Sequence, residues 1–262
     1  MLREITLGQY YPVSSPIHSL DPRTKLLGTL VFLISLFVTK SAAGYLVATV
    51  FLSFVILLSR VPFRFITKGL RAILFVLVIS VSFNIFLTDG TPVFVLGPLK
   101  ATREGLSLAA FMGIRLIYLV IGSSVLTLTT TPNALTNGLE TSLSFLNKIH
   151  VPVHEIAMMM SIALRFIPIL TEEADKIMKA QTARGADFSE GGLIHKAKAL
   201  IPLLVPLFIS AFRRASDLAM AMEARCYHGG EGRTRMKPLR YKKCDVAAFA
   251  VMAVYMAIMI AL

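Results

Sequence analysis

Long uninterrupted apolar runs constrain this chain more than any other feature of its sequence. The 262 residues are 55% hydrophobic and 16% charged, and soluble domains rarely reach the mean hydropathy of +0.71. A helix needs about 20 predominantly apolar residues to cross the hydrocarbon core of a bilayer. Apolar runs near that length recur along the chain, which predicts an all-α, multi-pass membrane protein with about five transmembrane helices.

The expected spans divide the chain into three parts. Residues 1–130 hold four spans, and residues 244–262 hold the last one. Residues 131–243 differ, because 16 Lys and Arg and 10 Asp and Glu are spread over them on a helical period. The expected spans are residues 24–40, 45–59, 73–87, 106–128 and 246–262.

Two loops and one charge interrupt the first four spans. A basic loop is expected at 60–71 and a second loop at 88–104. Arg115 is the clear intramembrane charge, within the fourth span. We expect it either to contact backbone carbonyls or Asn84, or to extend toward the membrane interface.

The positive charges predict the orientation of the chain. With the N-terminus inside, 23 of the 27 Lys and Arg lie on the cytoplasmic side and three lie outside. This bias follows the positive-inside rule. The N-terminus and residues 131–243 are therefore expected to be cytoplasmic, and the C-terminus to lie outside. The same rule explains the formal charge of +12 without a nucleic-acid partner.

Three helices are expected in the cytoplasmic region, at about 132–149, 153–183 and 193–224. Apolar residues recur in the second helix at steps of three and four, and prolines interrupt both long helices. Neither long helix is polar enough on its other face for a free surface helix. Both are therefore expected to pack partly at the level of the membrane.

The two long helices end in similar motifs. A shift of 41 residues aligns Ala183-Arg184-Gly185 with Ala224-Arg225-Cys226. An arginine at a helix C-terminus complements the helix dipole, and a following glycine adopts the left-handed cap, so capping is the ordinary explanation. Two such motifs on two long helices beneath a membrane domain favour a docking function.

These motifs resemble the paired Ala-Arg-Gly motifs of EcfT, the transmembrane (T) component of energy-coupling-factor (ECF) ABC-type transporters. The segment Leu20-Asp21-Pro22-Arg23-Thr24-Lys25-Leu26 is similar to the entry segment of that family, and the likeness covers the whole chain. Cys226 stands where the family motif has glycine, which concerns the cap geometry and not the role of Arg225.

The resemblance implies a membrane scaffold without catalytic residues or cofactors of its own. Two cytoplasmic ABC-type ATPases, which bind the ATP and magnesium, would dock on the coupling helices through Arg184 and Arg225. A separate membrane-embedded S component, exchangeable for others, would bind the vitamin or metal ion. ATP-driven movement would topple the S component and release its substrate into a prokaryotic cell, which places the chain in the cell (inner) membrane.

The residues agree with this implication. Guanidinium is a rigid, permanently charged fork that suits bidentate capture of a carboxylate. The sequence has no Walker A loop, no nucleophile elbow and no His-Glu-x-x-His motif. Its two cysteines and five histidines lack the spacing of a disulfide framework or a metal site.

Three other functions are weighed against this one. A secondary transporter usually has inverted repeats and broken midplane helices, and neither is recognisable here. An intramembrane enzyme needs acid, His or Cys groups that converge at span ends. A peripheral lipid-binding role would rest the basic helices on anionic lipid. Co-purification of two ATPases and a small hydrophobic protein separates these alternatives; the substrate itself is not identified by the sequence.

Overall fold

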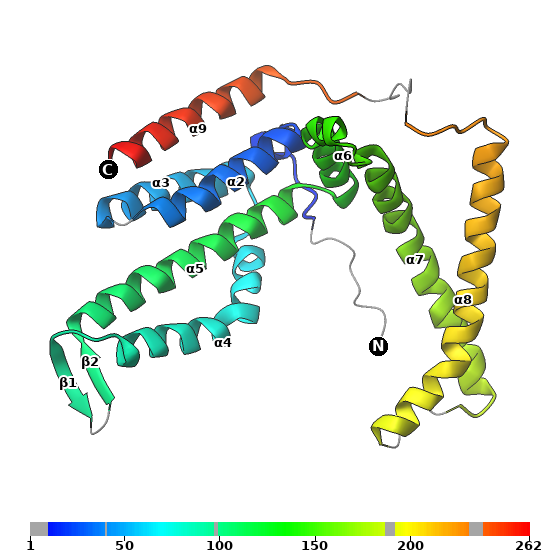
Figure 1. Cartoon of the computed structure of the whole chain (residues 1–262), viewed down its shortest axis with the longest axis horizontal. Helices are drawn as coiled ribbons and strands as arrows, with labels where there is room; N and C mark the ends of the chain where they lie inside the picture. Colours follow the sequence, from blue (N-terminus) through cyan, green and yellow to red (C-terminus); the bar gives the residue numbers. More distant parts are fainter. Residues whose placement is uncertain (1–9, 40, 97–98, 187–191, 231–237) are drawn as a thin grey trace. The chain divides into compact units, whose positions relative to one another are not determined.

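The computed structural model describes residues 10–39, 41–96, 99–186, 192–230 and 238–262 (Figure 1). Contacts divide the chain into two units. Gly8–Leu139 and Leu239–Leu262 form the first unit, which we call the membrane body. Glu140–Pro238 belong to the second, which we call the arginine unit because it contains both arginine motifs.

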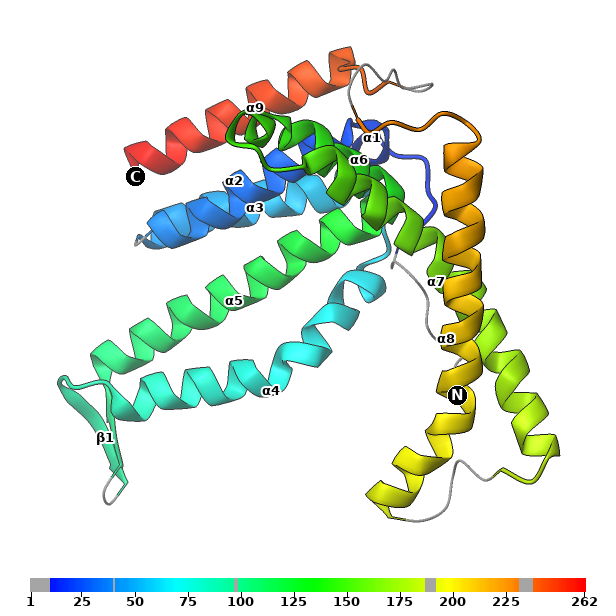
Figure 2. The same cartoon turned by 45° about the vertical axis from the view of Figure 1, so that its right-hand side comes forward.

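Helices make up most of the membrane body. They are α1 (Pro16–Ser19), α2 (Pro22–Val38), α3 (Ala42–Ser59), α4 (Phe63–Leu87), α5 (Arg103–Thr129) and α9 (Lys243–Ala261). Helix α6 (Pro132–Ser142) follows α5 and its last residues belong to the arginine unit. Helices α2, α3, α5 and α9 pack alongside one another, and α4 lies along α5 (Figures 1 and 2).

Apolar side chains of α2, α3, α5 and α9 form most of the core of the membrane body, with Ile66 of α4 and Val61 before it. Tyr255 of α9 brings a polar group into this core. Its hydroxyl is 2.6 Å from the hydroxyl of Ser35, and its ring stacks on Phe51. The other buried members are aliphatic or aromatic: Phe32, Leu36, Ala48, Leu52, Val61, Ile66, Ile121, Val125, Leu128 and Met259. Helix α9, last in sequence, is therefore integral to the packing of the first spans.

The segments expected as loops hold secondary structure. Phe63–Arg71, expected within the basic loop at 60–71, is helical and continues into Ile73–Leu87 across a bend of 60°. Within the loop expected at 88–104, β1 (Pro92–Leu96) and β2 (Leu99–Thr102) pair as an antiparallel hairpin. The expectation of a loop at 60–71 is therefore wrong for most of this segment. Its cations Arg64, Lys68 and Arg71 recur at steps of four and three, which is a helical spacing.

Several helices are long and apolar enough to cross a membrane. By length and composition these are, within the described residues, α3, α5 and α9 of the membrane body, together with two long helices of the arginine unit, and the bent α4 adds a sixth candidate. The all-α, multi-pass class is confirmed. Helix α2 has 17 residues, which is at the lower limit for a span. Which of these helices cross the bilayer stays a prediction.

The arginine unit is built on two long helices, α7 (Val153–Ala183) and α8 (Leu193–Glu223), preceded by the 3₁₀ helix η2 (Ser144–Ile149). They run antiparallel and cross (Figure 2). Arg214 of α8 pairs with Glu173 of α7 at 2.8 Å, and Gln181 near the end of α7 donates to the carbonyl of Pro202 at 3.4 Å.

Arg115 makes a structural contact inside the membrane body. Its Nε donates to the hydroxyl of Tyr45 at 3.0 Å, and Nη2 donates to the carbonyl of Thr39 at 3.4 Å. The expected contact with a backbone carbonyl is confirmed, whereas Asn84 as partner is wrong because its amide donates to Ser80 within α4. Arg115 thus satisfies a carbonyl at the C-terminus of α2, where a cation complements the helix dipole.

Candidate functional site: two arginine motifs at helix ends

The first motif closes α7 with a Schellman cap. Arg184 is the C-cap residue, and Gly185 follows it in the left-handed region with φ +87°. The amide of Gly185 donates to the carbonyl of Thr182, and the amide of Ala186 donates to the carbonyl of Gln181, both at 3.0 Å. These two bonds satisfy carbonyls that the helix end leaves without a partner.

The second motif closes α8 with the same cap, 41 residues later. Cys226 occupies the left-handed position with φ 55°. Its amide donates to the carbonyl of Glu223 at 2.9 Å, and the amide of Tyr227 donates to the carbonyl of Met222 at 3.1 Å. Every hydrogen bond of the first cap has its counterpart in the second, so the cysteine keeps the geometry that glycine gives the first motif.

Both motif arginines are presented outward from their helices. Arg184 and Arg225 are exposed, as are the alanines before them and the left-handed residues after them. Within the described part of the chain, neither guanidinium has a hydrogen bond or an ion pair. Because α7 and α8 run antiparallel, the motifs lie at opposite ends of the helix pair. Each motif is therefore exposed at its own end of the helix pair.

The chain that follows the second motif packs against the start of α7. A Cβ at Gly230 would lie 2.6 Å from Cδ2 of His154, which leaves room only for glycine. Nδ1 of His154 is in turn 2.9 Å from Oε1 of Glu140. The end of α8 and the beginning of α7 are thus connected through His154, inside the arginine unit.

The entry segment ties three helix ends of the membrane body together. Asp21 is the N-cap of α2, since its side chain accepts from the amide of Arg23 at 3.0 Å, and the Arg23 Nε lies 3.2 Å from the same carboxylate. The guanidinium of Arg23 stacks over the ring of Tyr241, 4.6 Å from its centroid. Lys25 donates to the carbonyl of Thr129, the last residue of α5, at 2.9 Å.

Asp245 completes this cluster from the first turn of α9. Its side chain has no exposed surface. One oxygen accepts from the amide of Asp21 at 2.8 Å, and the other accepts from the amide of Lys242 at 2.7 Å. We call Asp21, Arg23, Lys25, Tyr241, Lys242 and Asp245 the polar joint. Sequence reasoning missed Asp245, although an acid in the first turn of an apolar helix is a recognisable capping signal.

Next to the joint, His18 holds the segment that precedes α2. Its Nδ1 is 2.7 Å from the hydroxyl of Ser15, and its Nε2 is 3.0 Å from the carbonyl of Tyr11. Burial lowers the pKa of His18 below its ordinary value. A neutral ring suits both contacts, because Nε2–H donates to the carbonyl while Nδ1 accepts from the hydroxyl.

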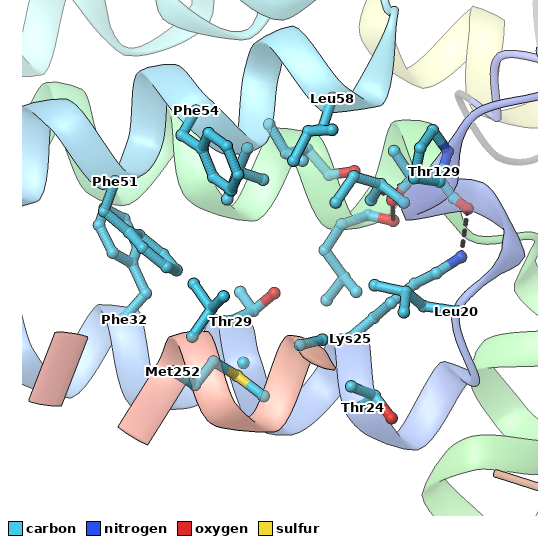
Figure 3. A pocket seen from close by; sticks show the side chains of 18 of the residues that line it. Leu20, Thr24, Lys25, Thr29, Phe32, Phe51, Phe54, Leu58, Thr129 and Met252 are labelled. Atoms are coloured by element: carbon cyan, nitrogen blue, oxygen red, sulfur yellow. Dashed lines mark hydrogen bonds between the residues drawn. The ribbon is translucent and has the colours of Figure 1, made fainter. Parts of the chain in front are cut away.

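A cavity of about 370 Å³ lies inside the membrane body (Figure 3). Side chains of α1, α2, α3, α5 and α9 line it, and Lys25 is the charged residue among them. Figure 3 shows the Lys25 ammonium directed to the Thr129 carbonyl, and it also donates to the carbonyl of His18 at 3.2 Å. Among the described residues that line the cavity there is no acid or histidine.

Metal ligands do not gather elsewhere in the described residues either: no group of three His, Cys, Asp or Glu side chains is placed to hold an ion. The two cysteines, Cys226 and Cys244, are exposed free thiols.

The matched caps predict opposite changes in stability for substitutions at their two left-handed positions. A left-handed residue with a Cβ costs roughly 1–2 kcal/mol, partly offset because glycine loses more entropy on ordering. We expect Cys226→Gly to stabilise its cap by about 1 kcal/mol and Gly185→Ala to destabilise its cap by about as much. A Cβ at Gly185 meets no atom within 4 Å, so the cost there is one of backbone conformation alone.

Hydrogen exchange at the amides of Tyr227 and Ala186 measures both effects, because each amide closes its cap with the bond that reaches five residues back along the chain. About 1 kcal/mol corresponds to roughly fivefold, slower at Tyr227 and faster at Ala186. Changes in the same direction at both amides would contradict the shared cap geometry.

Comparison with known proteins places the whole chain in one family. The family described as cobalt transport protein, CbiQ, matches residues 13–236. Three relatives carry the name "Energy-coupling factor transporter transmembrane protein EcfT". The protein of Clostridium kluyveri is 56% identical over 250 residues, 95% of this chain and 93% of the relative.

The protein of Thermosediminibacter oceani is 54% identical over 248 residues, 95% of this chain and 94% of the relative. That of Bacillus subtilis is 44% identical over 260 residues, 99% of this chain and 98% of the relative. Such identity over nearly the full length of each protein leaves no large part of the chain outside the likeness. The chain belongs to the CbiQ/EcfT family of energy-coupling factor transporter transmembrane proteins.

Proposed function

We propose that the chain is the non-catalytic membrane scaffold of an ECF-type ABC importer. It couples ATP hydrolysis by two cytoplasmic ABC-type ATPases to substrate release by a separate S component that binds a vitamin or a related micronutrient. ATP and magnesium are bound by the ATPases and not by this chain. Membership of the family supports this function, and one observation on the site carries it further.

That observation is the pair of exposed arginines on identical helix caps. A Schellman cap fixes the direction in which a helix ends, so each guanidinium extends from a rigid support. A planar fork on a rigid support loses less entropy on binding a carboxylate than a lysine would. Two equal anchors at opposite ends of one helix pair suit two equal partners, one ATPase for each motif.

The orientation belongs to the same proposal. The positive-inside bias places the N-terminus and the arginine unit on the cytoplasmic side of the cell membrane, where ATPases are accessible, and the C-terminus outside. Because α7 and α8 are themselves long and apolar, they lie at the membrane surface or partly within it. At this position each helix can contact both a cytoplasmic ATPase and a membrane-embedded S component.

Co-purification tests the proposal. The tagged chain, extracted from its own cells in mild detergent, is expected to bring down two ATPase polypeptides and a small hydrophobic protein. Recovery of the ATPases also tests the orientation, because cytosolic proteins reach only a cytoplasmic arginine unit. A tagged chain that is recovered folded and alone, from cells that express all the components, would refute the proposal.

A further inference from the structure

The polar joint lies where the chain passes between the two units. The chain leaves the membrane body after Leu139 and returns to it at Leu239. The joint residues Tyr241, Lys242 and Asp245 follow directly on the return, and α6 spans the exit. Both connections are fixed to the same five residues, 21–25, at the start of α2.

The outgoing connection is fixed through α5 and α6. Lys25 holds the carbonyl of Thr129 at the end of α5. Helix α6 then packs on the start of α2, because a Cβ at Gly138 would lie 2.9 Å from Cβ of Pro22. Glycine at this position allows the close approach of α6 to α2, so the exit lies against α2 up to the boundary of the unit.

The returning connection is fixed through Arg23 and Asp245. Arg23 stacks on Tyr241, two residues after the boundary. Asp245 takes the amide of Lys242 on one oxygen and that of Asp21 on the other, and it is completely buried. A buried carboxylate shared by two backbone amides holds the two helix starts at a fixed spacing, since sliding either one would leave a charged acceptor without its donor.

We propose that the polar joint is the fixed support of the arginine unit, and that Asp245 is its positioning residue. The inference rests on the proposed function. When the ATPases move the arginine unit through Arg184 and Arg225, the joint prevents both connecting segments from shifting relative to the start of α2. The movement is therefore delivered to the membrane helices α2, α5 and α9 instead of being absorbed at the boundary.

Asp245→Asn tests this role with a small change. The amide keeps the size of the side chain and one acceptor oxygen, while its NH₂ group faces a backbone amide that then has no acceptor. The complex with two ATPases and one S component is reconstituted in liposomes, and uptake of the radiolabelled vitamin of that S component is measured together with ATP hydrolysis. We expect the uptake per ATP hydrolysed to fall at least tenfold, with assembly and ATPase rate within twofold of wild type.

Asp89→Asn is the matched control, because Asp89 is an exposed acid in the same unit. It should leave the ratio of uptake to hydrolysis within twofold of wild type. If Asp245→Asn fails to assemble, Arg23→Lys and Tyr241→Leu are measured in the same way. These two variants weaken the stacked contact without placing an unpaired group in the buried site, and they too should lower the ratio.

The ratio separates a positioning role from a merely structural one. Uptake and hydrolysis that fall together, with an unchanged ratio in the variants that assemble, would overturn the inference and leave the joint as a contribution to stability. A wild-type complex without any ATP-dependent uptake would instead refute the proposed function, and this inference with it.

Discussion

Charge reversal at both motifs, Arg184→Glu with Arg225→Glu, is expected to abolish ATPase binding and uptake while the chain still inserts and folds. Removing one member of a buried, hydrogen-bonded charge pair at an interface costs about 2–5 kcal/mol. Because each ATPase binds one motif, each loses roughly thirtyfold in affinity at the lower value and roughly several thousandfold at the upper value. Neither side chain contributes to the described packing of its own chain, so the expected cost in stability is only the lost interaction with each helix dipole, about 0.3–1 kcal/mol per site. Pull-down of the ATPases with the tagged double variant measures the loss.

Two further double variants separate the causes. Lys176→Glu with Arg213→Glu makes the same change of charge at exposed positions on α7 and α8 away from the helix ends. It should recover the ATPases as wild type does. Arg184→Lys with Arg225→Lys keeps the charge but not the fork, and it should bind with intermediate affinity. Wild-type recovery of both ATPases by the charge-reversed motif variant would remove these residues as the docking anchors.

The two long helices of the arginine unit were predictable because their signals are local, whereas the single helix expected at 132–149 is wrong: the structure divides it into α6 (Pro132–Ser142) and the 3₁₀ helix η2 (Ser144–Ile149). The apolar spacing predicts α7 at 153–183, and the structure has it at those residues. Pro168 lies within the helix, which continues through it. The end of α8 differs by one residue from the expected 224, within the usual uncertainty of helix ends.

The geometry of the second motif was not predictable from residue types. Cysteine disfavours the left-handed region, so its propensity argues against a Schellman cap at Cys226. The carbonyls at the end of α8 nonetheless need donors, and the amides of Cys226 and Tyr227 supply them at the cost of a strained residue. A requirement of the helix end thus overrides the preference of a single residue.

Contacts between distant parts of the chain were also beyond local patterns. Asp245 and Asp21 are separated by 224 positions, and no periodicity relates them. Arg115 illustrates the same limit: its expected contact type was correct, but its partners Thr39 and Tyr45 depend on how α2, α3 and α5 pack. The docking role of the motifs and the division at residues 130 and 243 stay predictions.

Reconstitution distinguishes a scaffold from a transporter more directly than any single substitution. The purified chain alone in liposomes is expected to show no ATP hydrolysis and no uptake of any vitamin. Its sequence has no phosphate-binding loop, and the cavity of the membrane body holds one charge, already bound to two carbonyls. A secondary transporter would instead bind substrate and a coupling ion at such a site.

Stepwise addition of the partners completes the experiment. With the two ATPases but no S component, uptake should stay at the level of empty liposomes. Adding an S component should start ATP-dependent uptake, and exchanging it for another should change the vitamin taken up while the same chain is kept. The charge-reversed motif variant is the matched control, because it should stay inactive in the full mixture. Substrate-specific uptake by the chain alone would refute the scaffold and favour a secondary transporter, because a scaffold contributes no substrate site of its own.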